Sequence, residues 1–373
     1  MKIVFLVQGE GRGHLTQAIS LGQILRNAGH EITAAMVGAS EGRIIPSFFE
    51  EQIASPVYHF SAPNIVYNPQ AEGINLSATV YNLFRNASKY LSGLSLINQT
   101  IERLQPDLII SFYETYSGLY NVLYRSKVPM VCIAHQYLLL HPKFIFPKNS
   151  KVNQLIINFN SKLTSWLSAK RLALSFREME SRNDLKITVV PPLLRREVLN
   201  TKPTRENFLL VYMTHHSLSQ QIINWHLKHP EIKLHCFWDN HDASDEFVFD
   251  ETLTFHRINS EKYLRMLASC KALVTTAGFE SVCEAMYLGK PVMMVPVPNH
   301  FEQECNATDG VISGAGVTSK TFDLSVILEY LPNHLDQSQK FRAWYNRGEA
   351  MFLKEIEVFG SKNNVRPEVK SQA

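Results

Sequence analysis

Two segments of the chain carry side chains suited to proton transfer and to anion binding. The first is Gly9-Glu-Gly-Arg-Gly-His14, which follows a run of apolar residues. Histidine titrates near neutral pH, so His14 is a candidate general base, and Glu10 on the same loop is a second one. Glu114, which follows another apolar run, is a candidate carboxylate to orient the His14 imidazole. The alternative for His14 is that it caps a helix or contacts a phosphate.

The second segment begins at Thr276 and reads Thr-Ala-Gly-Phe-Glu-Ser-Val-Cys-Glu-Ala-Met-Tyr-Leu-Gly-Lys-Pro-Val. Gly278 precedes a helix pattern, and the free amides and positive dipole end of such a helix suit a diphosphate. Ser281 in the first turn adds a hydroxyl, and Glu284 lies three residues later on the same helix face. Taken alone, Ser281 and Glu284 also fit an exposed capping box.

The elements that must position these side chains alternate between strands and helices. Apolar runs predict strands, and the intervening helix patterns place those strands in parallel sheets, because strand–helix–strand units are typical of doubly wound α/β folds. The predicted strands span 3–7, 31–37, 106–111, 128–133, 187–190, 208–213, 234–238, 252–255, 272–275 and 292–295. In such sheets ligands bind beyond the carboxyl ends of the strands, which is where the loops of His14, Glu114 and Gly278 stand.

The strand series restarts after a polar stretch at 201–207, which predicts two Rossmann-like domains. With 373 residues the chain is long enough for both. We expect an amino-terminal acceptor-binding domain over 1–200 and a nucleotide-sugar-binding domain over 201–336. Residues 337–373 are expected to form one long helix from Gln337 to Phe359, packed back on the first domain, and a disordered tail.

The composition is that of a globular protein, with 45% hydrophobic and 19% charged residues. A net charge of +3 gives no argument for a nucleic-acid partner. The five cysteines include no C-x-x-C pair, which favours a reducing compartment over a disulfide framework. The apolar run near Met1 stops at Gln8 and is too short for a signal peptide or a membrane span. The sequence therefore predicts a cytoplasmic protein, with contact to the inner face of the membrane left open.

The segment from Thr276 continues as Pro296-Val-Pro-Asn-His-Phe-Glu-Gln-Glu-Cys-Asn-Ala307, and together these residues resemble the donor-binding signature of GT-B glycosyltransferases. The pattern is most similar to the UDP-glycosyltransferases and to MurG, the GlcNAc transferase of peptidoglycan synthesis. The glycine-rich loop that ends at His14 resembles the amino-terminal loop of that family. Pro192-Leu-Leu-Arg-Arg-Glu-Val-Leu199 resembles the MurG-type segment that enters the second domain.

The resemblance implies a donor site with a role for each matched residue. Glu284 would accept hydrogen bonds from both ribose hydroxyls, Glu302 and Gln303 would hold the donor sugar, and Arg195 would help to neutralise the leaving diphosphate. The loop of Phe255, Arg257 and Ile258 would hold a base, by analogy uracil. The implied donor-binding residues are Gly13, Arg195, Thr214, Ile258, Thr276, Gly278, Ser281, Glu284, Glu302 and Gln303. Many UDP-glycosyltransferases have histidine and tryptophan at the positions of Thr276 and Phe279, so the sequence departs from the pattern there.

Other chemistries fit these motifs less well. The loop from Gly9 lacks the G-x-G-x-x-G spacing, and no acidic residue ends the second strand, which argues against a dehydrogenase. His215 and His216 have no further metal ligand at a suitable spacing, although either remains a weak phosphate contact, as does Arg12. The cluster Asp239-Asn-His-Asp242 is similar to a D-x-D metal motif, but that motif belongs to a one-domain glycosyltransferase class. We therefore interpret it as a polar loop and expect no metal.

Residues 138–176 combine many apolar side chains with six lysines and arginines and contain no acidic residue. Such a segment suits contact with an anionic membrane, and it favours a lipid-linked or amphipathic acceptor. The alternative is an ordinary core helix with a solvated basic face.

The sequence predicts a hexosyltransferase that moves a sugar from a UDP-sugar, or another nucleotide diphosphate sugar, to an unidentified acceptor. The transfer is expected to invert the anomeric centre and to need neither metal nor cofactor beyond this co-substrate. Two alternatives remain. One is a UDP-GlcNAc 2-epimerase-like enzyme, and the other is a non-catalytic binding protein on the same scaffold.

Overall fold

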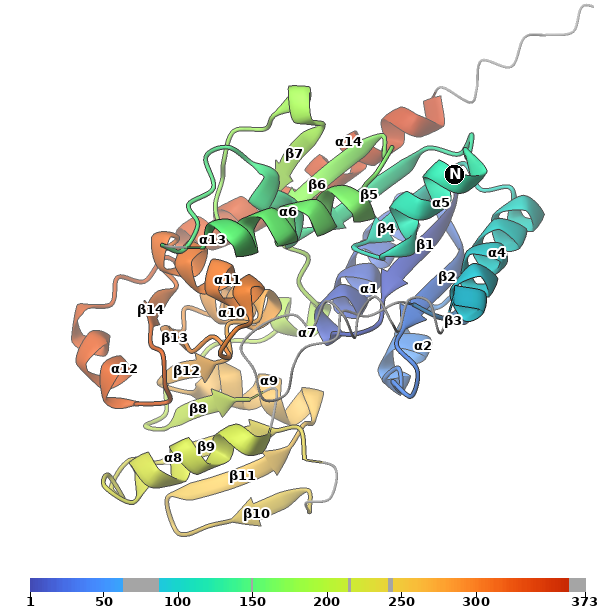
Figure 1. The fold of residues 1–373 in the computed structure, drawn as a ribbon. Coiled ribbons are helices and arrows are strands. Elements are labelled where there is room, and N and C mark those ends of the chain that lie inside the picture. The colour runs from blue at the N-terminus through green and yellow to red at the C-terminus, as the bar shows by residue number, and fades with distance from the viewer. Residues whose placement is uncertain (63–86, 149, 214–215, 241–243, 362–373) are drawn as a thin grey trace, which may run out of the picture. The chain divides into compact units, whose positions relative to one another are not determined.

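The structure is a computed structural model that describes residues 1–62, 87–148, 150–213, 216–240 and 244–361. The chain forms two compact units, whose elements are labelled in Figure 1. Unit 1 comprises Met1–Phe144, Leu155–Leu193 and the segment that starts at Arg347. Unit 2 comprises Ile145–Gln154 and Leu194–Asn346. Each unit is built on one sheet and is described separately.

The sheet of unit 1 has seven parallel strands in the order β3-β2-β1-β4-β5-β6-β7. Its central strands are continuous apolar runs, and all residues of β4 and β5 are buried. This pattern is typical of a parallel sheet that is covered on both faces. The strands are β1 Lys2–Gln8, β2 Glu31–Ala39, β3 Val57–Ser61, β4 Leu108–Phe112, β5 Met130–Ala134, β6 Lys170–Leu174 and β7 Ile187–Val190.

The helices of unit 1 connect these strands, and the last one comes from the far end of the chain. They are α1 Arg12–Asn27, α2 Ser47–Ile53, α4 Ala87–Leu104, α5 Tyr116–Tyr124, η1 His135–Leu140, α6 Lys151–Thr164, η2 Asn183–Leu185 and α14 Gly348–Ser361. Helix α6 begins in the short segment that is grouped with unit 2. Figure 1 shows α14, in red, lying along β6 and β7. Its Phe352 and Ile356 are buried, and Glu355 pairs with Lys170 of β6.

The sheet of unit 2 also has seven strands, in the order β10-β11-β9-β8-β12-β13-β14, and only the edge strand β10 is antiparallel to its neighbour. Its core includes Trp225, Trp238, Phe255 and Met293. The strands are β8 Leu209–Tyr212, β9 Leu234–Trp238, β10 Glu246–Val248, β11 Leu253–Arg257, β12 Ala272–Thr275, β13 Val292–Met294 and β14 Gly316–Thr318.

The helices of unit 2 are α7 Arg196–Leu199, η3 His216–Leu218, α8 Ser219–His226, α9 Ser260–Ser269, α10 Phe279–Tyr287, α11 Phe301–Ile312, α12 Ser325–Tyr330, η4 Leu331–Asn333 and α13 Ser338–Tyr345. Helix α10 ends at Tyr287, and Gly289, two residues later, has a φ of 71°, the left-handed conformation that glycine adopts readily. Pro291 then leads directly into β13, as the Gly-Lys-Pro sequence predicts.

The structure differs from the sequence prediction at the carboxyl end and within 138–176. The predicted helix from Gln337 to Phe359 is wrong as one element, because the chain forms α13 and α14 on either side of Asn346 and Arg347. Only α14 belongs to unit 1. Residues 138–176 are not one surface segment, since they contribute η1, α6 and the partly buried strand β6. The predicted disordered tail lies outside the described residues.

No described helix combines the length and the apolar character that crossing a bilayer would require.

Candidate functional site

In unit 1 the glycine-rich loop and Glu114 meet at the point where the strand order reverses. Strand β1 lies between β2 and β4, so the loop after β1 and the loop after β4 leave the same edge of the sheet on neighbouring strands. This is the position at which open α/β sheets bind ligands. Gly9 lets the glycine-rich loop pass close to Val37 and Ile45, because a Cβ at this position would lie 2.7 Å from Ile45 Cδ1 and 2.9 Å from Val37 Cγ1.

His14 lies in the first turn of α1 and is half-buried. Its Nδ1 is 3.3 Å from Oε1 of Gln17, one turn further along the helix. Its ring stacks on Tyr113 with a centroid separation of 5.8 Å. Because an amide oxygen only accepts, the Gln17 contact favours the tautomer with the proton on Nδ1, which leaves Nε2 as the proton acceptor.

Tyr113 follows β4 and was not singled out by the sequence analysis. Its φ of 57° is unusual for a tyrosine. The hydroxyl lies 2.9 Å from Oγ of Ser161 and accepts a hydrogen bond from Asn160, both on α6. The ring is therefore fixed between α6 and His14. No sequence signal announces a positive φ at a tyrosine, so the pattern gave no reason to select this residue.

Glu114 is fully buried and does not hydrogen-bond to His14. Its Oε1 accepts a hydrogen bond from the Tyr116 amide, and Oε2 faces Gly38 and has no hydrogen-bond partner among the described residues. Burial raises the pKa of this carboxyl to about 8, with a smaller contribution from the charge of Glu10. At neutral pH the carboxyl is therefore protonated, which does not suit the role of a charged partner for His14.

The remaining loop residues of unit 1 have structural contacts. Glu10 Oε1 accepts a hydrogen bond from the Ser40 amide and so ties the loop to the end of β2. The Arg12 guanidinium lies over the Phe48 ring, 5.2 Å from its centroid. Gly13 lies in the first turn of α1, where amides lack partners within the helix.

In unit 2 the strand order reverses at β8, between β9 and β12, and α10 begins just beyond the end of β12. Thr276 is buried at this strand end, and Gly278 is the residue before the helix. Because Gly278 has no side chain to cap α10, the amides of the first turn remain available to an anion. Ser281 lies in that turn and is half-buried.

Glu284 and Arg195 form a bidentate ion pair. Nε of Arg195 lies 2.6 Å from Oε1 of Glu284, and Nη2 lies 2.9 Å from Oε2. The exposed fractions of the two side chains are 19% and 4%. Nη1 of Arg195 also donates to Ser260, the first residue of α9, two positions after Ile258. Glu284, Arg195 and the loop of Ile258 therefore gather at one place in unit 2.

Tyr263 on α9 borders this cluster and was not found from the sequence. Its hydroxyl is buried near Ser281 and makes no hydrogen bond of ordinary geometry to the described residues. Burial, followed by the nearby charge of Glu284, raises the pKa of Tyr263 well above its ordinary value. A buried phenol without a partner is expected to be costly unless a ligand or water satisfies it.

The predicted sugar-binding pair lies at the start of α11. Glu302 is half-buried, while Gln303 is buried and accepts a hydrogen bond from the Val297 amide through Oε1. Asn306, one turn later, donates to the carbonyl of Ala277, beside Gly278. This bond fixes the start of α11 relative to the loop that leads into α10.

The other predicted contacts fare differently. Ile258 is half-buried after β11, whereas Phe255 is buried in the core and Arg257 pairs with Asp245. Thr214 and His215 lie outside the described residues, as do His241 and Asp242 of the Asp239 cluster. Among the residues that are described, no three His, Cys, Asp or Glu side chains gather as a metal site would require.

Sequence comparisons assign the chain a family over most of its length. The model of the family described as glycosyl transferase family 1 matches residues 1–334. An uncharacterized glycosyltransferase of Methanosarcina mazei is 29% identical over 137 residues, and one of Methanosarcina acetivorans is 27% identical over 137 residues. These matches cover 37% of the chain and only 34% and 32% of the two relatives.

Solved structures match along nearly the whole chain. The glycotransferase of kitacinnamycin has a TM-score of 0.64 at 15% identity, with 96% of this chain and 98% of that chain covered. UGT2 of Phytolacca americana, solved with UDP-2fluoro-glucose and pterostilbene, has a TM-score of 0.63 at 12% identity, with 96% and 99% covered. At these identities the likeness shows the fold, two Rossmann-like units in the GT-B architecture, as the sequence predicts.

Proposed function

Because the chain belongs to glycosyl transferase family 1, we propose that it transfers a sugar from a nucleoside diphosphate donor, UDP in the first instance, to an acceptor hydroxyl. The observation that carries the proposal is the buried carboxylate of Glu284, which lies on α10 and pairs with Arg195. The free amides in the first turn of the same helix follow Gly278. This arrangement pairs a hydrogen-bond acceptor for ribose with a binding site for phosphate.

The donor site follows from the lone pairs that the ion pair leaves free. Each oxygen of Glu284 accepts one bond from Arg195 and keeps further acceptor capacity for a ribose hydroxyl. The amides after Gly278, with Ser281 and Thr276, receive the diphosphate. Arg195 thus positions Glu284, and its charge also favours the departing diphosphate. Ile258 and Thr214 are assigned to the base and phosphate sides, and Glu302 and Gln303 to the sugar.

The transfer needs one proton acceptor, and we assign Nε2 of His14. It removes the proton of the acceptor hydroxyl as that oxygen bonds to the anomeric carbon. The bond from this carbon to the diphosphate breaks, and its electron pair leaves with UDP. Attack on the face opposite the leaving group inverts the anomeric centre. Gln17 and Tyr113 orient the imidazole, and Gly13 lies next to it in the first turn of α1. We expect no metal in this step.

We further propose a hexosyl donor and an acceptor with an apolar or lipid-linked part. The support for the acceptor is the side of α6, where Leu155 and Phe159 are exposed at helical spacing. A UDP-GlcNAc 2-epimerase-like activity remains the alternative enzyme, and it differs because it needs no acceptor. A non-catalytic binding protein is the other alternative.

A thermal-shift panel of nucleotides and nucleotide sugars, recorded with and without EDTA, tests the donor site. A ligand that binds only the folded state raises the melting temperature. We expect UDP or a UDP-sugar to raise it in the wild type and not in Glu284→Ala. Because Glu284→Ala also breaks an ion pair, each shift is measured from the variant's own unliganded melting temperature. Glu355→Gln is the matched control, since it breaks the part-buried pair with Lys170 in unit 1.

The results of this panel and of turnover assays distinguish the proposed transferase from its alternatives. A shift that survives in Glu355→Gln but not in Glu284→Ala supports the donor site. A shift by a different nucleotide corrects the base, and a response that disappears with EDTA contradicts metal independence. Turnover that persists in His14→Ala would remove the assigned base. Turnover of a UDP-sugar without any acceptor would favour the epimerase.

A further inference from the structure

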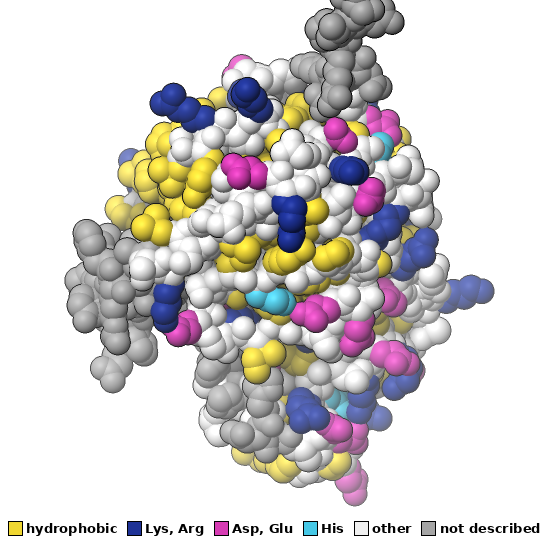
Figure 2. Space-filling view, turned by 90° about the vertical axis from the view of Figure 1, so that its right-hand side faces the viewer, with side chains coloured by type: hydrophobic (Ala, Val, Ile, Leu, Met, Phe, Trp, Pro, Cys, Tyr) yellow, Lys and Arg dark blue, Asp and Glu magenta, His cyan; other side chains and the backbone are white. Residues whose placement is uncertain are grey.

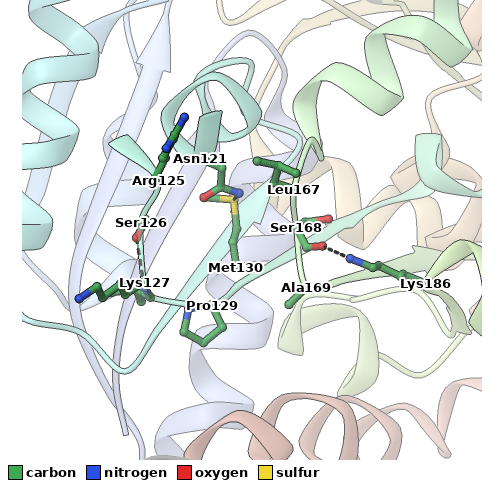
Figure 3. A pocket seen from close by; sticks show the side chains of 11 residues that line it. Asn121, Arg125, Ser126, Lys127, Pro129, Met130, Leu167, Ser168, Ala169 and Lys186 are labelled. Carbon is green, nitrogen blue, oxygen red and sulfur yellow. Dashed lines mark hydrogen bonds between the residues drawn. The ribbon is translucent and has the colours of Figure 1, made fainter. Parts of the chain in front are cut away.

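A cavity of about 350 Å³ lies at the edge of the unit 1 sheet opposite the one that carries His14. Its lining comes from the segment that enters β5, from the segment that enters β6, and from the residue before β7. Figure 3 shows these side chains, with Lys186 bonded to the carbonyl of Ser168. The cavity therefore lies at the amino ends of these strands. A molecule bound in it would not cover the loops at their carboxyl ends.

The lining is cationic. It includes Arg125, Lys127 and Lys186 and no carboxylate. Within the described parts of the chain, none of these three cations forms an ion pair. By contrast, the neighbouring Lys170 pairs with Glu355, and Arg182 pairs with Asp184. Three unneutralised cations around one hollow suit an anionic group.

Exposed apolar residues adjoin the lining residues in the sequence, and we call them the rim. Leu123 and Tyr124 directly precede Arg125 at the end of α5, and Trp166 and Leu167 directly precede Ser168. Their exposed fractions are 59%, 40%, 49% and 64%. Among these, an exposed tryptophan and tyrosine beside lysine and arginine are the combination that favours a membrane interface.

The two halves of the rim are fixed to each other. Asn121 of α5, which lines the cavity, donates a hydrogen bond to the carbonyl of Trp166. Gly118 of α5 lies so close to the end of α6 that a Cβ would stand 1.8 Å from the Leu163 carbonyl oxygen. The exposed apolar residues thus belong to a rigid corner.

Backbone strain marks the same place. Arg125, Leu167 and Lys186 have φ of 46°, 56° and 55°, a conformation that costs free energy for residues other than glycine. Glycine or asparagine would adopt this conformation at a lower cost in free energy, yet three residues that line the cavity are of other types. Phe159 and Leu155 lie four residues apart on one face of α6, the helix that precedes Trp166, and they are 68% and 72% exposed.

We propose that this corner of unit 1 docks the protein on an anionic phospholipid bilayer. The cations of the cavity receive lipid phosphates, and the rim, with Phe159 and Leu155, enters the interface between headgroups and acyl chains. Apolar surface alone would also suit a second copy of the chain, but a second copy would bring the same three cations and no matching acidic cavity. On the face of the molecule drawn in Figure 2, hydrophobic side chains gather at the upper left, and charged side chains of both signs are scattered over the rest. The proposal adds to the proposed function and does not rest on it.

Vesicle flotation of the full chain without nucleotide tests the proposal. The probes are vesicles of phosphatidylcholine and vesicles of phosphatidylcholine with phosphatidylglycerol, at low and high salt. We expect binding to the anionic vesicles at low salt, a large loss at high salt, and little binding to neutral vesicles.

Two sets of variants locate the contact. Replacing Arg125, Lys127 and Lys186 together by asparagine, which tolerates positive φ, is expected to lower the partition coefficient about a hundredfold. The control replaces the exposed Lys202, Lys228 and Lys320 by asparagine, which removes the same charge elsewhere. Leu155→Gln with Phe159→Gln is expected to weaken binding severalfold, whereas Leu335→Gln, at a residue 75% exposed in unit 2, is not.

Equal loss in both asparagine triples would overturn the proposal, as would equal binding to neutral and anionic vesicles. Absence of vesicle binding at low salt would overturn it too. If Leu155→Gln with Phe159→Gln instead abolishes a concentration-dependent dimer measured by light scattering, the face is an interface between copies. Nucleotide thermal shifts are recorded on the same samples, so that failure of docking is distinguished from failure of the donor site.

Discussion

The ion pair of Arg195 and Glu284 shows how one residue sets the environment of another. Removing one partner of a buried pair leaves the other charge without compensation, which costs several kcal/mol. We therefore expect Arg195→Ala to lower the free energy of unfolding of unit 2 by about 3 kcal/mol. Urea unfolding followed by tryptophan fluorescence measures it, because Trp225 and Trp238 both lie in the core of unit 2.

A matched control is Arg347→Ala, which breaks another arginine–glutamate pair. Arg347 and Glu178 are 52% and 61% exposed, so water screens their pair and its loss should have little effect on stability. If Arg195→Ala were no more destabilising than Arg347→Ala, the prediction that the buried pair contributes more to stability would be contradicted.

Glu114 offers a second residue-scale test because its carboxyl is protonated at neutral pH. The pKa rises from 4.5 in the unfolded chain to about 8 in the folded chain. The unfolded chain therefore loses this proton first, and stability falls as pH rises between these values. Glu114→Gln should remove that slope and so gain stability relative to the wild type as the pH approaches 8. Thermal unfolding at a series of pH values measures the slope.

The same variant tests the role that the sequence suggested for Glu114. A glutamine mimics a neutral carboxyl, so transfer at pH 7 should remain within a few fold of the wild-type rate. If a charged Glu114 orients His14, the loss would instead reach several orders of magnitude, as for the aspartate of catalytic triads.

At the scale of elements, the packing of α5 on the end of α6 depends on Gly118. A Cβ there would meet the Leu163 carbonyl oxygen at 1.8 Å and the Trp166 amide nitrogen at 2.9 Å, and backbone atoms cannot turn aside. We expect Gly118→Ala to destabilise unit 1 by about 3 kcal/mol or more, beyond the usual range for overpacking.

Gly22→Ala is the control for this change, because Gly22 lies inside α1 and its Cβ would find ordinary contacts at 3.5 Å. Alanine is the better helix former, so this variant should gain up to about 1 kcal/mol. Chemical denaturation compares the two, and similar losses in both would contradict the steric argument.

Elements with continuous apolar runs were predictable from the sequence. The runs 187–190, 234–238 and 272–275 coincide with β7, β9 and β12. The missed strands lack that signal: β6 begins with Lys170 and Arg171, β10 is exposed throughout, β14 has three residues, and the apolar run of β3 is interrupted by His59. The first is a strand because its neighbours β5 and β7 supply its hydrogen bonds, and that pairing is not local information.

The site was predictable in its residue types and less so in its contacts. Glu284 and the turn after Gly278 follow from local spacing on one helix. The partner of Glu284 is Arg195, 89 positions away, and no spacing rule selects it over Arg196. The contact of His14 with Gln17 is local, but only the structure shows Glu114 turned toward Gly38 and Tyr116. Burial decided that outcome, and burial depends on the whole sheet.

For the whole molecule, α14 makes the stability of unit 1 depend on the end of the chain. A chain that ends at Asn346 lacks the buried Phe352 and Ile356 and the pair of Glu355 with Lys170. Leaving the two apolar sites open should cost unit 1 at least about 3 kcal/mol. Calorimetry should show an earlier transition for unit 1 and an unchanged one for unit 2. A chain that ends at Ser361 is the control, and equal melting of both shortened chains would contradict the prediction.

Helix α14 also sets an order of events during synthesis. When the ribosome has completed β7, unit 1 still lacks the helix that covers β6 and β7. The segment Leu194–Asn346 must be made first, which takes on the order of ten seconds at ordinary elongation rates. Throughout that interval β6 and β7 of the nascent chain lack their cover, because α14 has not yet been made. A chaperone that shields apolar strands on the ribosome would find its substrate in this interval, which ends only when α14 has been made.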